Sequence, residues 1–349
     1  MTALFRGAED MHFSPIGVPA VDQTAGHFRA SYARCALQAS GNFTGVLPST
    51  DTSNSPLTQG WRIPSSYGIV VGNFWFTARV FNVNGGDTAG GSGLFWNALG
   101  PGDITRLQIR RTGSGTPPIV FEIVKVNAAG VATRLTTFTG GVATGAVTKF
   151  DVHVNYATNG FITVYFDGDI LANYSGDVTT DGATTITGVD MGSWSAAPAS
   201  VSYTSWSEII WDTTDTRSMG LVTVYPTATG NLDQWTGTFG DVTQIINNDL
   251  SFNSAGASNL VQLYNNNSLP AGEFSIVDFT STARAISSGV PATYDFELVT
   301  HAVTYDSPVQ TPGGVLGLQW YTWATNPNTS LPWTIAEANV LQQGMKSLT

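Results

Sequence analysis

Residues 147–176 read VTKFDVHVNYATNGFITVYFDGDILANYSG, and this stretch decides the fold. Its first part carries apolar side chains at alternate positions, namely Phe150, Val152, Val154 and Tyr156. Successive side chains of a β-strand point to opposite faces, so a spacing of two places these four on one face. The other face of this strand carries polar residues. We therefore predict a strand with one face in a core.

Two turn signals divide the same stretch. The segment 157–160 contains an Asn-Gly pair and Asp167-Gly168 follows a β-branched and aromatic run at 161–166. Both pairs tolerate positive φ and are typical of hairpin turns. The run 161–166 is apolar at both parities, which indicates a strand covered on both sides, as in the middle of a sandwich. The stretch thus predicts three antiparallel strands inside a β-sandwich.

The rest of the chain extends this pattern. Of 349 residues, 38 are glycine and 16 proline, and strand-like segments from about residue 69 to 212 alternate with turns roughly every 8–12 residues. We predict an all-β protein: a concanavalin-like jelly-roll sandwich at 1–217, a connector at 218–250, and a smaller β-sandwich domain at 251–349. The expected strands of the smaller domain are 260–264, 274–286, 293–300 and 315–324.

One short helix is expected near the end of the chain. Thr334 and Glu337 have the spacing of a capping box, which satisfies free N–H groups of a first helical turn. The apolar stripe that follows extends the expected helix to about Gln343, with Gly344 as its terminator.

Charge argues against one class of function. The net charge is −11, the isoelectric point is about 4.6, and only Lys125, Lys149 and Lys346 supply lysine. Nucleic-acid binding through counterion release needs a basic stripe, and the adjacent pair Arg110-Arg111 is too small to form one. We expect no nucleic-acid partner and an ion-paired or solvated role for that pair.

Other signals bear on the cellular context. Cys35 is the single cysteine, so an intrachain disulfide is impossible. The first ten residues contain three charged side chains and lack the basic-then-apolar pattern of a secretory signal. No apolar run approaches ~20 residues, so we expect no membrane insertion.

The search for catalytic carboxylates gives no constellation. A glucanase of this fold needs paired carboxylates on one strand, commonly as an E-x-D-x-x-E run. Glu122 and Glu208 instead stand alone, and we expect both at solvated or edge positions. The Gly-Ser-Gly segments at 90–93 and 113–115 lack the spacing of a nucleophile elbow. We predict no catalytic residue and no enzyme activity, although a depolymerase stays open.

Metal and cofactor sites are not predicted. Asp167 and Asp169 could bind calcium, and Asp212 and Asp215 a cation, through carboxylate and loop oxygens, but a hairpin turn is the favoured role for the first pair and a solvated loop for the second. No two histidines have the spacing of a transition-metal site; they are His12, His27, His153 and His301. No Walker or dinucleotide fingerprint is present, so we expect no cofactor.

Aromatic residues leave a glycan site open. The chain has ten tryptophans, and four of them fall near expected loops or strand ends: Trp61, Trp96, Trp194 and Trp206. Such rings can stack on sugar faces, whereas core packing or subunit contact explains them too.

Several motifs resemble a known family. The segment 149–172 is similar to the central hairpin of laminin-G-like and concanavalin-A-like jelly rolls. The series SEIIWDTT (207–214), GLVTVYPTATGNLDQW (220–235) and NPNTSLPWTIAEANVLQQGMK (326–346) resembles tailed-bacteriophage virion structural proteins, whose jelly roll precedes a C-terminal β-domain. The resemblance covers most of 145–349 and brings no catalytic motif.

Two functions follow as hypotheses. The first is a structural component of a bacteriophage particle: a tail-fibre, spike, baseplate or head-decoration subunit. It would be located in the virion, contact other virion proteins and host-surface glycans, and form a homo-oligomer, with a trimer expected. The alternative is a glycan-binding or glycan-cleaving depolymerase module.

Overall fold

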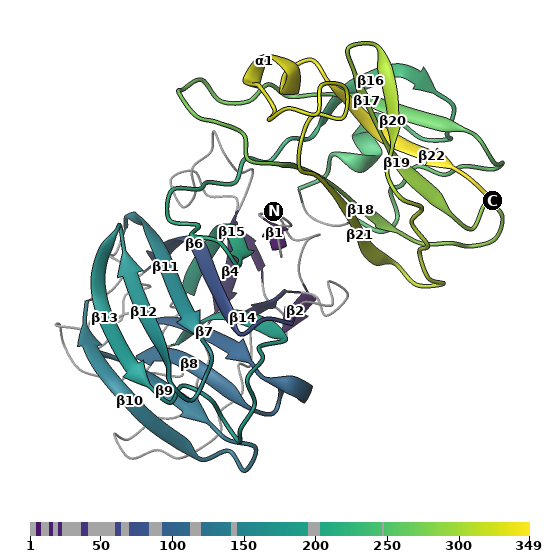
Figure 1. The fold of residues 1–349 in the computed structure, drawn as a ribbon. Helices are drawn as coiled ribbons and strands as arrows, with labels where there is room; N and C mark the ends of the chain where they lie inside the picture. The colour runs from purple at the N-terminus through teal and green to yellow at the C-terminus, as the bar shows by residue number, and fades with distance from the viewer. Residues whose placement is uncertain are drawn as a thin grey trace. The chain divides into compact units, whose positions relative to one another are not determined.

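The computed structural model shows two compact units, Ala3–Leu221 and Val222–Thr349 (Figure 1). The residues that it describes are 5–7, 14–16, 20–22, 36–40, 60–63, 70–83, 93–111, 120–140, 145–194, 203–245 and 248–349. His12, His27, Cys35 and the Gly-Ser-Gly segments lie wholly or mostly outside them. Each unit is described separately below.

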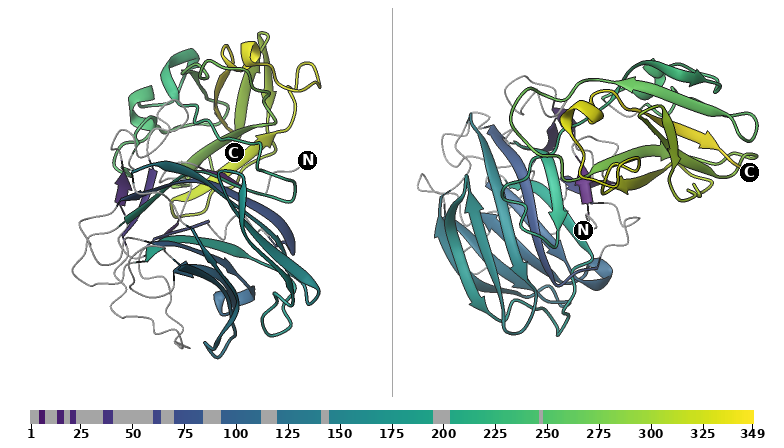
Figure 2. Two further views of the ribbon diagram at one scale, coloured as in Figure 1. Left: turned by 90° about the vertical axis from the view of Figure 1, so that its left-hand side faces the viewer. Right: turned by 45° about the horizontal axis from the view of Figure 1, so that its top comes forward.

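The first unit is a jelly-roll sandwich of two antiparallel sheets, as predicted (Figure 2). Its eight-stranded sheet has the order β13 (Asp169–Gly176), β12 (Gly160–Phe166), β11 (Val147–Asn155), β6 (Asn73–Val83), β15 (Tyr203–Asp212), β4 (Ala36–Ser40) and β3 (Ala20–Asp22), with β1 (Phe5–Gly7) paired to β15. The seven-stranded sheet has the order β10 (Ala132–Thr139), β9 (Val120–Val126), β8 (Arg106–Arg111), β7 (Gly93–Leu99), β14 (Gly188–Trp194), β5 (Gly60–Arg62) and β2 (Ser14–Ile16).

The predicted hairpins are confirmed, and their register sets which side chains face inward. Phe150 pairs with Phe166 and Val154 with Ile162 across β11 and β12. Asp167 and Gly168 both have positive φ, at 49° and 93°, as the second turn requires. The first turn differs from the expectation, since Gly160 is needed for space: a Cβ there would lie 2.0 Å from the Asn155 carbonyl oxygen.

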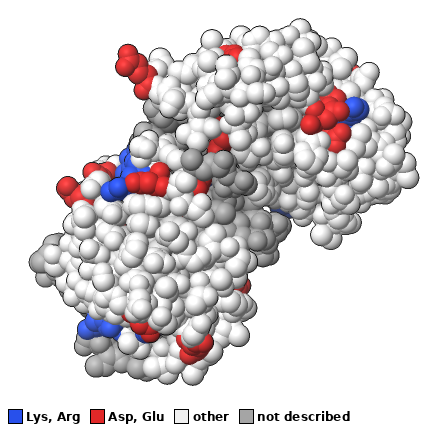
Figure 3. Space-filling view, in the orientation of Figure 1, with Lys and Arg blue, Asp and Glu red and all other residues white. Residues whose placement is uncertain are grey.

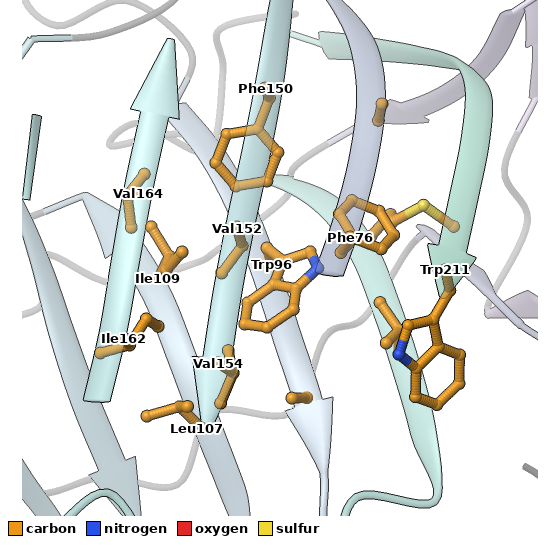
Figure 4. Close-up of a cluster of buried hydrophobic side chains, with 14 of the residues drawn as sticks. Phe76, Trp96, Leu107, Ile109, Phe150, Val152, Val154, Ile162, Val164 and Trp211 are labelled. Atoms are coloured by element: carbon orange, nitrogen blue, oxygen red, sulfur yellow. The ribbon is translucent and has the colours of Figure 1, made fainter. Parts of the chain in front are cut away.

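The core between the two sheets is large and aromatic. Inward residues of β6, β11 and β12 meet Trp96, Leu107 and Ile109 of the opposite sheet (Figure 4). The rings of Phe76 and Trp96 lie with their centroids 5.8 Å apart. Burial of such side chains stabilises the fold by about 1.5–3 kcal/mol each relative to leaving them exposed.

The second unit contains a five-stranded sheet and a two-stranded ribbon. The sheet has the order β16 (Pro226–Asp233), β17 (Val261–Asn266), β22 (Gln342–Ser347), β19 (Tyr294–Thr300) and β20 (Val303–Asp306). The ribbon pairs β18 (Phe279–Ala285) with β21 (Gly317–Trp323). A smaller core joins Phe296 and Leu298 of the sheet to Trp323 of the ribbon and to Trp333.

The connector expected at 218–250 differs in the structure. Within it, β16 pairs with β17 and so belongs to the sheet of the second unit. The short 3-10 turn η4 (Phe239–Val242) follows it. The sequence of β16, PTATGNLD, lacks the apolar alternation that marks a strand, because β16 is an edge strand that is mostly half-buried or exposed.

The C-terminal helix is shorter than expected. The capping box of Thr334 and Glu337 is confirmed, but α1 spans only Ile335–Ala338. Of the residues expected to continue it, Gln342 and Gln343 begin β22 instead. Gly344 is not a helix terminator: a Cβ there would lie 1.8 Å from the Gln262 carbonyl oxygen, so glycine permits the close pairing of β22 with β17. Among the described residues we find no helix that could span a membrane.

Candidate functional site

The outer face of the eight-stranded sheet carries the most chemically varied group of side chains. Because strand side chains alternate, the neighbours of the core residues on β6, β11 and β12 point away from the core. These outward residues are Asn73, Trp75 and Thr77 on β6, Lys149, Asp151, His153 and Asn155 on β11, and Phe161, Thr163 and Tyr165 on β12. We call this group the outer-face site.

An array of aromatic rings runs across the outer-face site. The rings of Trp75 and His153 stack with centroids 3.9 Å apart and an interplanar angle of 13°. Phe161 meets His153 edge-on at 4.7 Å. Tyr165 lies 5.9 Å from Trp75 in a stacked arrangement. His153 and Phe161 are half-buried, so these two rings are the part of the array that solvent can reach.

The surroundings of His153 favour the neutral imidazole, because they lower its pKa. Burial lowers its pKa, and the nearby Arg217 adds to this effect against the charge of Asp215. The Nε2 atom lies 3.3 Å from Oδ1 of Asn73. A neutral imidazole that donates through Nε2 keeps Nδ1 as an acceptor, which can take a hydrogen from a hydroxyl group.

Arg217 covers the other end of the array. Its guanidinium carbon lies 4.8 Å from the ring centre of Trp75 and 4.9 Å from that of Tyr165. Asp215 accepts from its Nε and Nη2 atoms, with the shortest distance 2.7 Å. The pairing raises the pKa of Arg217 and lowers that of Asp215. The guanidinium is therefore fixed face-on over two rings.

Asp151 lies at the centre of the site and is not at a solvated position, contrary to the polar-face expectation. Its exposed fraction is 0%. Oδ1 accepts from the hydroxyl of Thr77 at 2.5 Å, and Lys149 Nζ lies 3.8 Å away. Oδ2 has no hydrogen-bond partner within the described part of the chain. Burial raises the pKa of Asp151 despite the stabilising hydroxyl and lysine.

The isolated acidic residues have other roles. Glu122 is buried and ion-paired, with Oε1 2.8 Å from Arg110 Nε and Oε2 2.5 Å from Arg134 Nε. This finding corrects the solvated role expected for Glu122 and confirms an ion pair for Arg110. Glu208 is also buried, at φ 52° where the register of β15 shifts. Glu122, on β9, belongs to the sheet opposite the outer-face site.

The aspartates that the sequence offers as metal ligands make other contacts in the structure. Asp167 accepts from the backbone N–H of Lys149 at 2.8 Å. Asp212 pairs with Arg6 at 2.8 Å and is buried. The described residues contain no group of three histidine, cysteine, aspartate or glutamate side chains able to hold a metal.

Three of the four tryptophans singled out from sequence lie elsewhere, and the side chain of the fourth, Trp194, is outside the described part of the structure. Trp61, Trp96 and Trp206 are buried in the sandwich core, so packing explains them. Trp75 belongs to the site and is not among the tryptophans that the sequence places near loops. Its signal was the alternation of NFWFTARVFN, which sets Trp75 and Thr77 opposite Phe74 and Phe76.

A second ionisable cluster lies in the second unit. Lys346 Nζ is 3.1 Å from Asp306 and 3.9 Å from Glu297. Burial and then the charge of Asp306 raise the pKa of Glu297 to about 7. The cluster also contains Asp295, whose pKa burial raises. Figure 3 shows that charged side chains on the visible face gather in a few separate groups.

This cluster predicts a pH dependence of stability. Between pH 4.5 and about 7 the folded state binds more protons at Glu297 than the unfolded state, so stability falls as pH rises. We expect the free energy of unfolding to fall by about 1–2 kcal/mol over this range. This is less than the full pKa difference would give, because solvent and Lys346 screen the charge of Glu297. Urea unfolding at pH 5 and 8 measures it. Glu297→Gln should flatten the difference, and an equally steep dependence in that variant would contradict the assignment.

Comparisons with known proteins give only weak similarity. No family model and no curated protein matches the sequence. A carbohydrate binding module from Bacillus subtilis aligns with a TM-score of 0.35 and 5% identity, over 58% of this chain and 96% of its own. An endo-beta-1,4-glucuronan lyase from the fungus Trichoderma reesei gives 0.40 and 14%, over 61% and 96%. An alginate lyase from Chlorella virus gives 0.40 and 12%, over 57% and 90%. The fold assignment therefore rests on the strand pairing described above.

Proposed function

We propose that the protein binds glycans through the outer-face site. The observation that carries this proposal is the half-exposed aromatic array of Phe161 and His153, edged by the amides of Asn73 and Asn155. Ring faces carry negative charge density, which attracts the C–H groups on the flat side of a sugar. Amide groups and the Nδ1 atom of His153 can then fix the hydroxyl groups.

The surroundings of the site support a sugar over a charged polymer. Only 11% of residues are charged, so Thr, Ser, Asn and Gly supply most polar groups. At the site, Arg217 is paired with Asp215 and Lys149 lies beside Asp151. Arg79 of β6, opposite Lys149, adds one further guanidinium, and a single arginine is too little to hold a polyanion by charge alone.

Affinity electrophoresis with soluble polysaccharides tests the proposal. A panel would contain a neutral β-glucan, a mannan, alginate and a polyglucuronate. We expect Phe161→Ala to weaken binding by about tenfold to whichever polysaccharide slows the wild-type protein in the gel. A tenfold change corresponds to the loss of an aromatic contact of about 1.4 kcal/mol. The matched control is Phe252→Ala, which removes an exposed phenylalanine from the second unit. Equal retention of both variants would reject this face as the site.

The same incubations separate binding from cleavage. We expect no new reducing ends, because no catalytic carboxylate pair is predicted. Product formation by the protein, lost in His153→Ala, would instead establish a depolymerase.

The role in a bacteriophage particle stays a prediction from sequence resemblance. It includes the virion location, the virion protein partners and the trimeric state. Mass spectrometry of purified particles and light scattering of the isolated protein test these expectations. Absence of the chain from particles would remove this hypothesis and leave glycan binding untouched.

A further inference from the structure

A short segment crosses the outer-face site and covers its centre. We call residues 213–219 the strap. It leaves the end of β15 and places Thr216 against the sheet, where its hydroxyl lies 2.5 Å from that of Thr77. Lys149 Nζ donates to the carbonyl oxygens of Arg217 and Met219, the latter at 3.2 Å. Thr216 is the one fully buried side chain of the strap.

Three backbone N–H groups of the strap form local hydrogen bonds. The N–H of Thr214 bonds to the side chain of Asp212, that of Arg217 to the side chain of Asp215, and that of Met219 to the Thr216 carbonyl. The contacts to the sheet are polar or cation–π and are interactions that water or a ligand can replace.

The surface under the strap is not a core surface. A sheet face covered permanently is normally apolar, as the inner faces here are. Below the strap lie instead Thr77, Lys149 and Asp151, flanked by Trp75 and Tyr165. Asp151 Oδ2 is fully buried and lacks a partner in the described part of the structure, which is an unfavourable state for a carboxylate oxygen.

We propose that the strap is displaceable and covers a second, deeper glycan subsite formed by Lys149 and Asp151. Displacement moves Arg217 off two aromatic rings, which then become available to a sugar face. A sugar hydroxyl donates to Asp151 Oδ2, and another accepts from Lys149 in place of the two strap carbonyls. The ligand class is a sugar unit with adjacent free hydroxyl groups. This inference rests on the proposed glycan binding.

A reversible disulfide tests the movement. The hydroxyl oxygens of Thr77 and Thr216 are 2.5 Å apart, so cysteines there can bridge with little adjustment. The variant is Thr77→Cys with Thr216→Cys, in a Cys35→Ser background. We expect the oxidised form to bind the retained polysaccharide at least tenfold more weakly than the reduced form, and dithiothreitol to restore binding. Equal binding by both forms overturns the inference.

Hydrogen exchange keeps the test independent of the glycan. In the free wild-type chain, amides of 213–219 should exchange at least 100-fold faster than those of 150–154 in β11, and oxidation of the cysteine variant should slow them. Strap amides as protected as β11 amides would overturn the inference even if no polysaccharide binds. If the strap amides exchange fast but no polysaccharide binds, the proposed function and the deeper subsite are both refuted. Only the movement of the strap would then stand.

Discussion

Replacement of Trp206 by alanine is expected to lower the free energy of unfolding of the first unit by about 3–5 kcal/mol. The indole is fully buried and lies edge-on to Phe150, with centroids 5.9 Å apart. Its Nε1 donates across the sandwich to the carbonyl oxygen of Gly192 at 3.2 Å. The variant therefore loses the ring contacts of Trp206, opens a cavity and loses the hydrogen bond to β14. Urea unfolding monitored by circular dichroism measures the change.

Two controls separate the components of this effect. Trp206→Phe keeps most of the ring and removes the N–H group, so its loss of about 1–2 kcal/mol isolates the bond to Gly192. Phe252→Ala, at an exposed position, should change stability by less than about 0.5 kcal/mol. A loss below 1 kcal/mol for Trp206→Ala would show that the indole is not part of the core.

Trp206 also shows how far the sequence predicts the fold. The alternation in β6 and β11 is strong, because each strand has a core on one side, and it predicts the sandwich, while the turn pairs predict the hairpins. Trp206 was placed among loop-proximal rings, since the neighbours in SYTSWSEIIW alternate only partly. β16 and β22 were missed because polar edge residues and a pairing glycine carry no apolar period.

The outer-face site was less predictable than the fold. The sequence indicates which side chains of β11 face outward, because Lys149, Asp151 and His153 alternate with core residues. It does not indicate the burial of Asp151, because the strap that covers it lies about 60 residues further along the chain and reads as a polar loop. Nothing local in FDVHVN distinguishes an aspartate under a strap from one in water. Only the tertiary contact of Thr216 with Thr77 makes that difference.

Lys149→Met is expected to destabilise the first unit by about 3 kcal/mol at pH 7, the lower end of the range for removing one member of a buried ion pair. Asp151 would keep the hydroxyl of Thr77 and the more distant charges of Arg79 and Arg217, but would lose the ammonium group 3.8 Å away. The carbonyls of Arg217 and Met219 would lose their donor as well. Urea unfolding of the variant at several pH values measures the loss.

The pH profile and a double-mutant cycle identify the cause. Burial already raises the pKa of Asp151, and removal of Lys149 raises it further. At pH values above the pKa of Asp151 in the unfolded chain, the folded variant then binds more protons than the unfolded variant. The variant therefore gains stability as pH falls towards 4. Lys149→Met with Asp151→Asn has no buried charge and should be more stable than Lys149→Met alone by about 1–2 kcal/mol. If the losses from Lys149→Met and Asp151→Asn add and neither depends on pH, Lys149 stabilises the unit only by anchoring the strap. The charge of Lys149 then has no effect on Asp151.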